Sequence, residues 1–397
     1  MTMFFVALYL LIFTFPSILI DWLQIRHIRI YSQKTAVILP PKDYITSAKY
    51  SLSTLRLSII HSLFDAVIFA CWVLFGFYIL QEYFGFYPSH LESIAFVLSF
   101  VAVNSVLSLP LKAYQQLVLD KRFGFSTITP KLFVLDTLKG FVLMLFFGFV
   151  ILWILVSVMS YTHWWLAGFG FVFMVLILLN MFYPTLIAPI FNTFTPLNDE
   201  NLKTKIQDLM QKAGFHAKGV FVMDASRRDG RLNAYFGGLG SSKRVVLFDT
   251  LLEKVSTEGL LAILGHELGH FKHKDILVNL SIMGVLLFVL FFIAGHLPES
   301  IFSLLRIEKN DATTLIVLLL IAPIVSFWVM PIIGYFSRKA EYRADSYGAS
   351  LTNPHCLKEA LIRLVNENKT FPYAHKIYIF FHYTHPPLLD RLYALKD

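Results

Sequence analysis

The sequence is organised around residues 266–296, HELGHFKHKDILVNLSIMGVLLFVLFFIAGH, where a histidine-containing stretch is followed by an apolar one. His266-Glu267-Leu268-Gly269-His270 matches the pattern HExxH. On a helix, residues i and i+4 lie on one face, so both imidazoles can reach one metal ion. Glu267 follows the first His on the same side, where it can act on an attacking water. The alternative is two surface histidines on an ordinary helix.

The composition indicates a membrane protein. Of the 397 residues, 56% are hydrophobic and only 15% are charged, and 39 are Phe. A soluble domain carries about 25% charged residues. Runs of about 20 apolar residues can cross a bilayer as helices. We expect about seven such spans, at residues 3–20, 58–80, 92–110, 140–160, 164–183, 276–296 and 312–335.

The basic residues cluster in two of the connections between the spans. One lies between the first two spans, from Arg26 to Arg56, and the other lies between the third and fourth, from Lys112 to Lys139. The connection near Glu82 to Glu92 contains no Lys or Arg. By the positive-inside rule the basic connections are cytoplasmic, so we expect the N-terminus outside. These charges flank spans and form no aromatic-interleaved patch, so we expect no nucleic-acid partner.

The rest of the chain divides into soluble and membrane segments. We expect N-terminal membrane helices over 1–190, a soluble metalloprotease segment over 191–275, two last spans over 276–335, and a C-terminal cytoplasmic segment over 336–397. The soluble segment predicts an amphipathic helix after Asn198-Asp199 and strands at 217–224, 232–236 and 243–248, with a turn at 237–242. With no Gly or Pro from Phe271 to Ser281, the HExxH helix is expected to continue into the sixth span.

Two His ligands need a third, and the best candidate is Glu341. The position six residues after His270 holds Ile276, which excludes the three-histidine pattern, and two cysteines are too few for a Cys-type site. Glu341 completes a His2Glu zinc site with an open position for water. Asp345, one turn later, can hydrogen-bond the outer nitrogen of a ligand His. His270 precedes the sixth span and Glu341 follows the seventh, so both emerge at one membrane edge.

Two further residues leave alternatives open. The stretch Asn233-Ala234-Tyr235-Phe236 could pair with an extended substrate as an added strand, or it could be an ordinary edge strand. His385 stands before Pro386 and Pro387, whose rigid extended loop suits the placement of a side chain. A lone His in a loop is nevertheless more often structural than catalytic.

Several motifs together resemble the type I CAAX prenyl endopeptidase family of multi-spanning gluzincin metalloproteases, over nearly the whole chain. They are residues 121–126 (KRFGFS), 233–236 (NAYF), 244–252 (RVVLFDTLL), 266–270 (HELGH), 337–345 (SRKAEYRAD), 384–387 (THPP) and 390–392 (DRL). The family has Asn after FGF where this chain has Ser126.

The resemblance implies a multi-pass α-helical membrane protein with seven helices around a water-filled intramembrane chamber. A small α+β gluzincin-like zinc protease domain would lie at its cytoplasmic side. It implies one Zn²⁺ per chain held by His266, His270 and Glu341, with Glu267 as catalytic base. Asn233 and His385 would contact substrate or stabilise the tetrahedral intermediate, and Arg391 would support the site. The expected partners are the bilayer and a peptide or protein substrate that is prenylated or membrane-associated.

The connection after the sixth span is short, which favours a bacterial member in the cell membrane, where prenylated CAAX substrates are not obvious. Removal of a C-terminal tripeptide from a prenylated protein is the family activity. Three alternatives stay open: a quality-control metalloprotease without prenyl specificity, a transporter or receptor, and a zinc-binding scaffold without activity. About seven continuous spans and an ionisable cluster at the membrane edge disfavour the first two, and Glu267 disfavours the third.

Overall fold

The computed structural model describes residues 2–237 and 243–395. Within them, seven helical segments are long and apolar enough to cross a membrane, which confirms the predicted number. Each begins before or continues beyond the apolar stretch that predicted it. The segments are Thr2–Tyr31, Pro41–Phe84, His90–Arg122, Pro130–Val158, Trp164–Phe191, Asp275–Gly295 and Asp311–Leu351.

Four of these segments contain a π-helical turn (η). The first consists of α1 (Thr2–Tyr9), η1 (Leu10–Thr14) and α2 (Phe15–Tyr31), and the second of α3 (Pro41–Cys71), η2 (Trp72–Gly76) and α4 (Phe77–Phe84). The third consists of α5 (His90–Ala113), η3 (Tyr114–Leu119) and α6 (Asp120–Arg122), and the fifth of α8 (Trp164–Phe182), η4 (Tyr183–Ile187) and α9 (Ala188–Phe191). The remaining segments are α7 (Pro130–Val158), α13 (Asp275–Gly295) and α15 (Asp311–Leu351).

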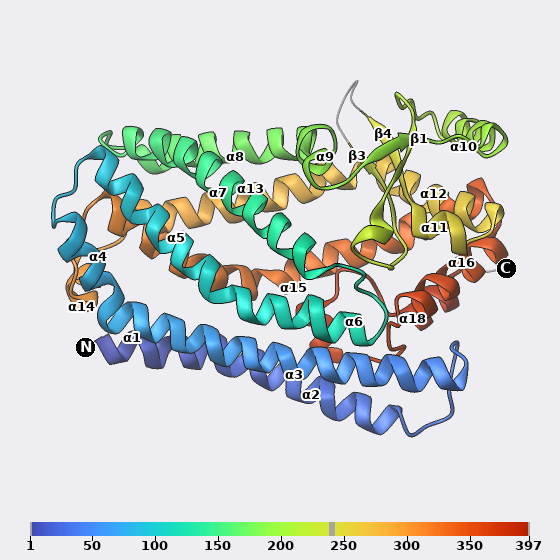
Figure 1. Cartoon of the computed structure of the whole chain (residues 1–397), viewed down its shortest axis with the longest axis horizontal. Coiled ribbons are helices and arrows are strands. Elements are labelled where there is room, and N and C mark those ends of the chain that lie inside the picture. The colour runs from blue at the N-terminus through green and yellow to red at the C-terminus, as the bar shows by residue number, and fades with distance from the viewer. Residues whose placement is uncertain (1, 238–242, 396–397) are drawn as a thin grey trace.

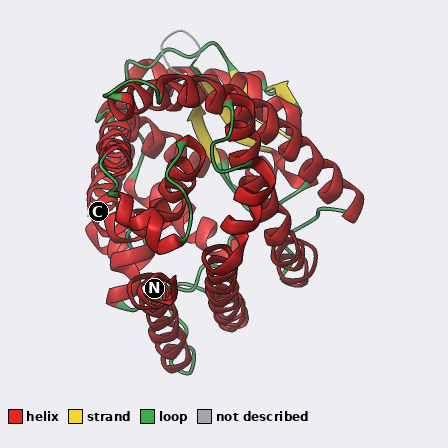
Figure 2. Ribbon diagram, turned by 90° about the vertical axis from the view of Figure 1, so that its left-hand side faces the viewer, coloured by secondary structure: helices red, strands yellow, loops and turns green. Residues whose placement is uncertain are grey.

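The long helices are arranged in a ring when seen end-on (Figure 2). Only 6% to 22% of each apolar window is buried inside the protein. Many buried residues of the spans gather in a core that includes Phe96 and Leu155. A cavity of about 860 Å³ opens between α5, α7 and residues 228–231. The arrangement agrees with the chamber that the resemblance implies.

A small mixed sheet lies beside the helices. Its strands are β1 (Phe194–Pro196), β2 (Val220–Met223), β3 (Ala234–Gly237) and β4 (Arg244–Phe248), in the order β1-β2-β4-β3. β2 and β4 are parallel, and the two edge strands are antiparallel to their neighbours. The three predicted strands are found, whereas β1 was not predicted. The expected turn at 237–242 lies, apart from Gly237, outside the described residues.

The helix that carries HExxH is α12 (Thr257–Lys272), and the expectation that it continues into the sixth span is wrong. Its last turn ends at Lys272, Lys274 adopts a left-handed conformation with φ of 57°, and α13 begins anew at Asp275. The left-handed residue reverses the local direction of the backbone without Gly or Pro. The membrane span and the HExxH helix are therefore separate elements.

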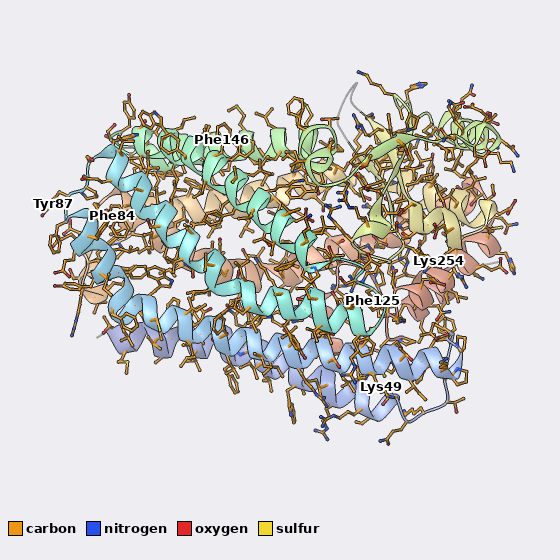
Figure 3. The ribbon with its side chains drawn as sticks, in the orientation of Figure 1. Lys49, Phe84, Tyr87, Phe125, Phe146 and Lys254 are labelled. Atoms are coloured by element: carbon orange, nitrogen blue, oxygen red, sulfur yellow. The ribbon has the colours of Figure 1, made fainter. Side chains whose placement is uncertain are left out.

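The other short helices gather at the two ends of the molecule (Figure 1). Around α12 lie α10 (Glu200–Lys212), α11 (Asp249–Lys254), α16 (Pro354–Glu367) and α18 (Leu388–Ala394), while α17 (Lys376–His382) packs on α15. At the opposite end lie the N-terminus and α14 (Glu299–Leu305). Lys49 and Lys254 lie at the α12 end, whereas Phe84 and Tyr87 lie at the α14 end (Figure 3).

Candidate active site

Small residues bring the HExxH helix into direct contact with α15. A Cβ atom on Gly269 would lie 2.6 Å from Cα of Ala344, and one on Gly348 would lie 2.6 Å from the backbone nitrogen of His266. Neither distance is tolerated by real atoms, so these positions set how closely the two helices approach. The Glu341 side chain reaches the histidines because of this close approach. α15 runs without interruption from the membrane span to Glu341.

The three expected ligands converge. One ligand atom from each of His266, His270 and Glu341 lies within 4.8 Å of the other two. Nε2 of His270 is 3.2 Å from both His266 Nε2 and Glu341 Oε1. Glu341 Oε2 is buried and has no hydrogen-bond partner in the described part of the chain. An unsatisfied carboxylate oxygen beside two imidazole nitrogens is what a divalent cation would satisfy, so the site fits a metal.

Asp345 and Arg391 support this ligand set from one side. Asp345 Oδ1 lies 2.8 Å from His266 Nδ1, the nitrogen that faces away from the other ligands. Arg391 donates two hydrogen bonds to Asp345, at 2.6 and 2.8 Å, and its Nη1 lies 3.4 Å from Glu341 Oε2. Both residues are buried, so this bidentate pair holds the carboxylate in one orientation.

Asp275 supports the second histidine, and sequence reasoning missed it. Its Oδ2 lies 2.9 Å from His270 Nδ1, and its Oδ1 accepts a hydrogen bond of 2.8 Å from Arg343. Each ligand His therefore has a carboxylate on its outer nitrogen, which fixes the tautomer that presents Nε2 to a metal. The only sequence signal was an acidic residue five positions after His270, and a continuous helix would not have brought it back to the imidazole.

The surroundings shift the pKa values of two residues of the HExxH helix. Burial raises the pKa of Glu267 despite the attraction of His266 and His270. Burial alone would lower the pKa of His270, but its hydrogen bonds with Glu341 and Asp275 raise it to about 9. A metal that binds this imidazole therefore competes with a proton.

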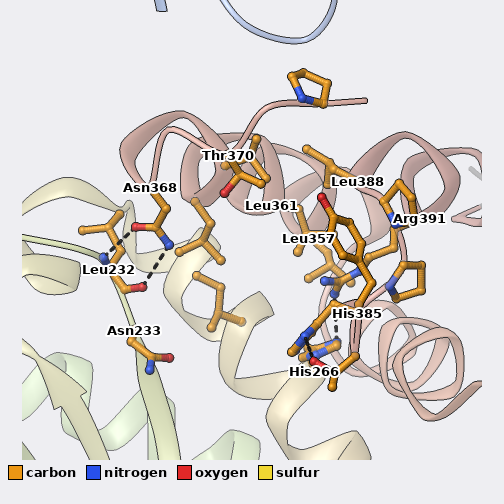
Figure 4. Close-up of a pocket in the computed structure, with 18 of the residues that line it drawn as sticks. Leu232, Asn233, His266, Leu357, Leu361, Asn368, Thr370, His385, Leu388 and Arg391 are labelled. Carbon is orange, nitrogen blue, oxygen red and sulfur yellow. Dashed lines mark hydrogen bonds between the residues drawn. The ribbon is translucent and has the colours of Figure 1, made fainter. Parts of the chain in front are cut away.

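A cavity of about 520 Å³ leads to these residues (Figure 4). Asn233 and Ala234 line it on one side, and His266, Glu267 and His385 line it on another. The His385 ring is exposed in the cavity, with Nε2 3.3 Å from Glu341 Oε1. Asn233 accepts a hydrogen bond from the amide of Ala234 on its Oδ1, at 2.9 Å. Asn233 thus lines the same cavity as His266.

The loop that carries His385 is anchored by the helix that carries Glu341. Arg338, one turn before Glu341, donates to the carbonyl groups of Ile379 and Tyr383 at the end of α17. A Cβ on Gly334 would lie 2.9 Å from the Tyr383 carbonyl, so the loop packs directly on α15. Glu341 and His385 thus share one rigid support.

Comparisons with known protein families match the chain from residue 24 to residue 397 in two parts. Residues 24–193 match the model of the CAAX prenyl protease N-terminal region, described as five membrane helices. Residues 196–397, which contain every ligand candidate, match the model of peptidase family M48. The boundary falls at β1, between the fifth span and the sheet.

Similar proteins and a solved structure agree with the two family matches. CAAX prenyl protease 1 of Saccharomyces cerevisiae is 33% identical over 334 residues, covering 77% of this chain and 72% of the yeast protein. The human CAAX prenyl protease 1 homolog is 30% identical over 363 residues, covering 79% and 76%. The crystal structure of S. mikatae Ste24p superposes with a TM-score of 0.90 at 26% identity, covering 99% of this chain and 98% of that one.

These matches exclude the transporter and receptor alternatives, because both halves of the chain match peptidase families and the ligand set lies where a metallopeptidase needs it. Family M48 membership also implies a metal cofactor, and His266, His270 and Glu341 form a group that could hold one. The chain therefore belongs to peptidase family M48, as a multi-pass membrane metalloendopeptidase of the type I CAAX prenyl protease family.

Proposed function

We propose that the metal is zinc and that His266, His270 and Glu341 are its protein ligands. The observation that carries this proposal is the convergence of two Nε2 atoms and a buried, unsatisfied carboxylate oxygen. Two nitrogens and one oxygen, with room for a fourth ligand, form the donor set of catalytic zinc sites, whereas magnesium and calcium prefer oxygen ligands. Bound there, zinc would polarise the scissile carbonyl and lower the pKa of the attacking water.

The residues around the proposed ligands have separate roles in the reaction. Glu267 takes a proton from the attacking water and passes it to the leaving amine. A raised pKa suits a carboxylate that must hold the proton between these two steps. His385 and Asn233, from two sides of the cavity, donate hydrogen bonds to the substrate as its carbonyl oxygen gains negative charge. Arg391 orients Asp345 and Glu341.

The proposed substrate is a prenylated protein or peptide that loses its C-terminal tripeptide. Support comes from the relatives named CAAX prenyl protease 1 and from the hollow arrangement of apolar helices beside the site. The cavity of about 860 Å³ combines apolar side chains such as Phe133 and Phe141 with polar ones such as Lys112. Such a lining suits an amphiphilic substrate with a lipid tail and a polar peptide.

We further propose that the protein lies in a bacterial inner membrane and that its active site faces the cytoplasm. The basic connections between the first two spans and between the third and fourth lie at the same end of the molecule as α12 (Figure 1). By the positive-inside rule this is the cytoplasmic end. The bacterial assignment rests on the short connection that follows the sixth span.

The proposal is tested with detergent-purified wild type, Glu267→Gln, and Glu258→Gln as a matched control. Glu258 is exposed in the first turn of the same helix. Zinc content is measured by mass spectrometry, and cleavage is measured on a farnesylated CAAX-type peptide and on the same peptide without its lipid. We expect zinc near one per chain in all three proteins, and cleavage by the wild type and Glu258→Gln but not by Glu267→Gln.

The outcomes separate the parts of the proposal. Equal cleavage of the two peptides would remove the prenyl specificity and favour a general membrane metallopeptidase. Absence of zinc from the wild type would remove the proposed cofactor, and activity of Glu267→Gln close to wild type would remove the proposed base.

A further inference from the structure

The free edge of β3 has a defined pattern of backbone groups. The carbonyl of Asn233 accepts a hydrogen bond from the amide of Phe248, so Asn233 faces β4. In an antiparallel pair, successive residues turn their N–H and C=O groups alternately toward and away from the partner strand. Leu232 and Ala234 therefore turn theirs to the opposite edge. Both residues line the cavity that contains His266 and Glu267.

Asn368 occupies this edge at Leu232. Its Oδ1 accepts a hydrogen bond of 3.0 Å from the Leu232 amide, and its Nδ2 donates one of 3.5 Å to the Leu232 carbonyl (Figure 4). A side-chain amide offers one acceptor and one donor side by side, as a peptide group of a neighbouring strand does. Asn368 thus takes the place that the next residue of an added strand would occupy.

The position of Asn368 is fixed by its neighbours at the C-terminal end of α16. Lys369 adopts a left-handed conformation with φ of 47°, which ends the helix. Its ammonium group donates to the carbonyl of Phe123 and lies 4.9 Å from the centre of the Phe125 ring. The amide of Thr370 bonds back to Val365. The turn is held between the helix it ends and the KRFGFS segment.

We propose that Asn368 determines substrate length by closing one end of the substrate-binding edge of β3. An added substrate strand can pair with the carbonyl of Ala234, and with its amide once the Asn233 side chain that accepts from it turns away. At Leu232 both backbone groups are already bound by Asn368. Asn368 therefore limits how many substrate residues can pair with β3 on the side of the scissile bond that lies toward Leu232. The inference rests on the proposed peptidase function and extends it, because a fixed limit lets an endopeptidase release a fragment of short, defined length.

The test uses two sets of peptides around one cleavable sequence. One set is extended residue by residue on the amino side of the scissile bond, and the other on the carboxyl side. kcat/KM is measured for wild type, Asn368→Ala and Asn368→Asp. Asp keeps the acceptor for the Leu232 amide but sets a carboxylate against the Leu232 carbonyl. Asn366→Ala is the matched control, because its side chain makes no hydrogen bond in the described part of the chain and lies two residues from Asn368.

We expect the wild type to show a sharp fall of kcat/KM with length in one of the two sets. Asn368→Ala should raise kcat/KM for the over-long peptides of that set about tenfold relative to the shortest, since a pair of backbone hydrogen bonds becomes available to them. The other set and Asn366→Ala should be unchanged. For the over-long peptides, kcat/KM of Asn368→Asp should lie between the values of wild type and Asn368→Ala. Metal content reports whether each variant is folded.

Three results would overturn the inference. One is a length limit that Asn368→Ala and Asn368→Asp leave unchanged while they cut the shortest peptide. Another is loss of folding in both variants, which would make Asn368 a structural residue. The third is a wild type that cuts no peptide at all, which would remove the proposed function as well. If the wild type cuts peptides but the variants keep the same length limit, only the role of Asn368 is removed.

Discussion

At the scale of single residues, the two ligand histidines are held by different carboxylates. Asp345 binds His266 and is itself held by Arg391, which is buried. Asp275 binds His270 and is held by Arg343, whose side chain is half exposed to solvent. The first pair is shielded from water and the second is partly screened. His270 is therefore the ligand whose support is easier to weaken without unfolding the site.

We expect Asp275→Asn to lower zinc affinity by about 10- to 100-fold, the usual effect of removing a carboxylate behind a ligand His. The amide can still accept a hydrogen bond from the imidazole, but it lacks the charge that makes His270 a stronger ligand. The measurement is competition for zinc against a chelating dye. Asp208→Asn, on the exposed face of α10, is the control. Equal affinities for wild type and Asp275→Asn would show that Asp275 does not support the metal.

Sequence reasoning proposed the ligand candidates but not Asp275, and one error explains the difference. The HExxH pair is visible in the sequence because helix geometry fixes which residues share a face. Glu341 is visible because it follows the seventh span, as His270 precedes the sixth, so both emerge at one membrane edge. Asp275 reaches His270 only because the backbone turns at Lys274, and a left-handed Lys has no sequence signature. Asp275 was thus missed because the helix was expected to continue past Lys274.

At the scale of elements, the site depends on how closely α12 and α15 pack. The contact is made by Gly265, Gly269, Ala344 and Gly348, each without a side chain or with a single methyl group. Glycine inside a helix is unfavourable by about 0.5–1 kcal/mol relative to alanine. Its presence at these positions serves the close approach of the helices and not the stability of either helix alone.

Gly269→Ala should therefore cost the enzyme its activity even though alanine favours the helix. The new methyl group would lie 2.6 Å from Ala344 Cα, so the helices must separate and the distance between His270 and Glu341 must grow. A misplacement of about 1 Å in an active site can cost about 100-fold in rate. We expect a loss of that order together with lower zinc content, measured on the purified variant.

Gly170→Ala on α8 is the matched control, because the new Cβ would meet no atom of the described residues within 4 Å beyond its own helix backbone. It should keep full activity and zinc. A Gly269→Ala enzyme as active as Gly170→Ala would mean that the contact of α12 with α15 does not set the ligand geometry.

The elements themselves were predictable to different degrees. The seven spans and the strands β2, β3 and β4 follow from apolar length and from β-rich composition. β1 escaped prediction because it has three residues, one of them Pro, and forms only through its pairing with β2. The contact of α12 with α15 joins residues about 80 positions apart in the sequence. Isolated glycines do not predict which helices will pack together.

At the scale of the whole molecule, the metal ligands connect the membrane part with the protease part. His266 and His270 belong to α12, which packs on the sheet and on α16, whereas Glu341 belongs to the helix that forms the seventh span. The buried core of the spans, which includes Phe96 and Leu155, does not contain these three residues. A cation bound between α12 and α15 therefore contributes to the cohesion of the molecule as well as to catalysis.

Removal of the metal should consequently lower the thermal stability of the entire chain. A ligand at about 1,000 times its dissociation constant stabilises the folded state by about 4 kcal/mol. In detergent, a chelator should lower the melting temperature of the wild type, and added zinc should restore it while magnesium should not, since the site holds imidazole nitrogens. Glu341→Gln, which lacks one ligand charge, should melt at a temperature that responds much less to chelator or zinc. A wild-type melting temperature that chelation leaves unchanged while removing the metal would show that the two parts are held together by packing alone.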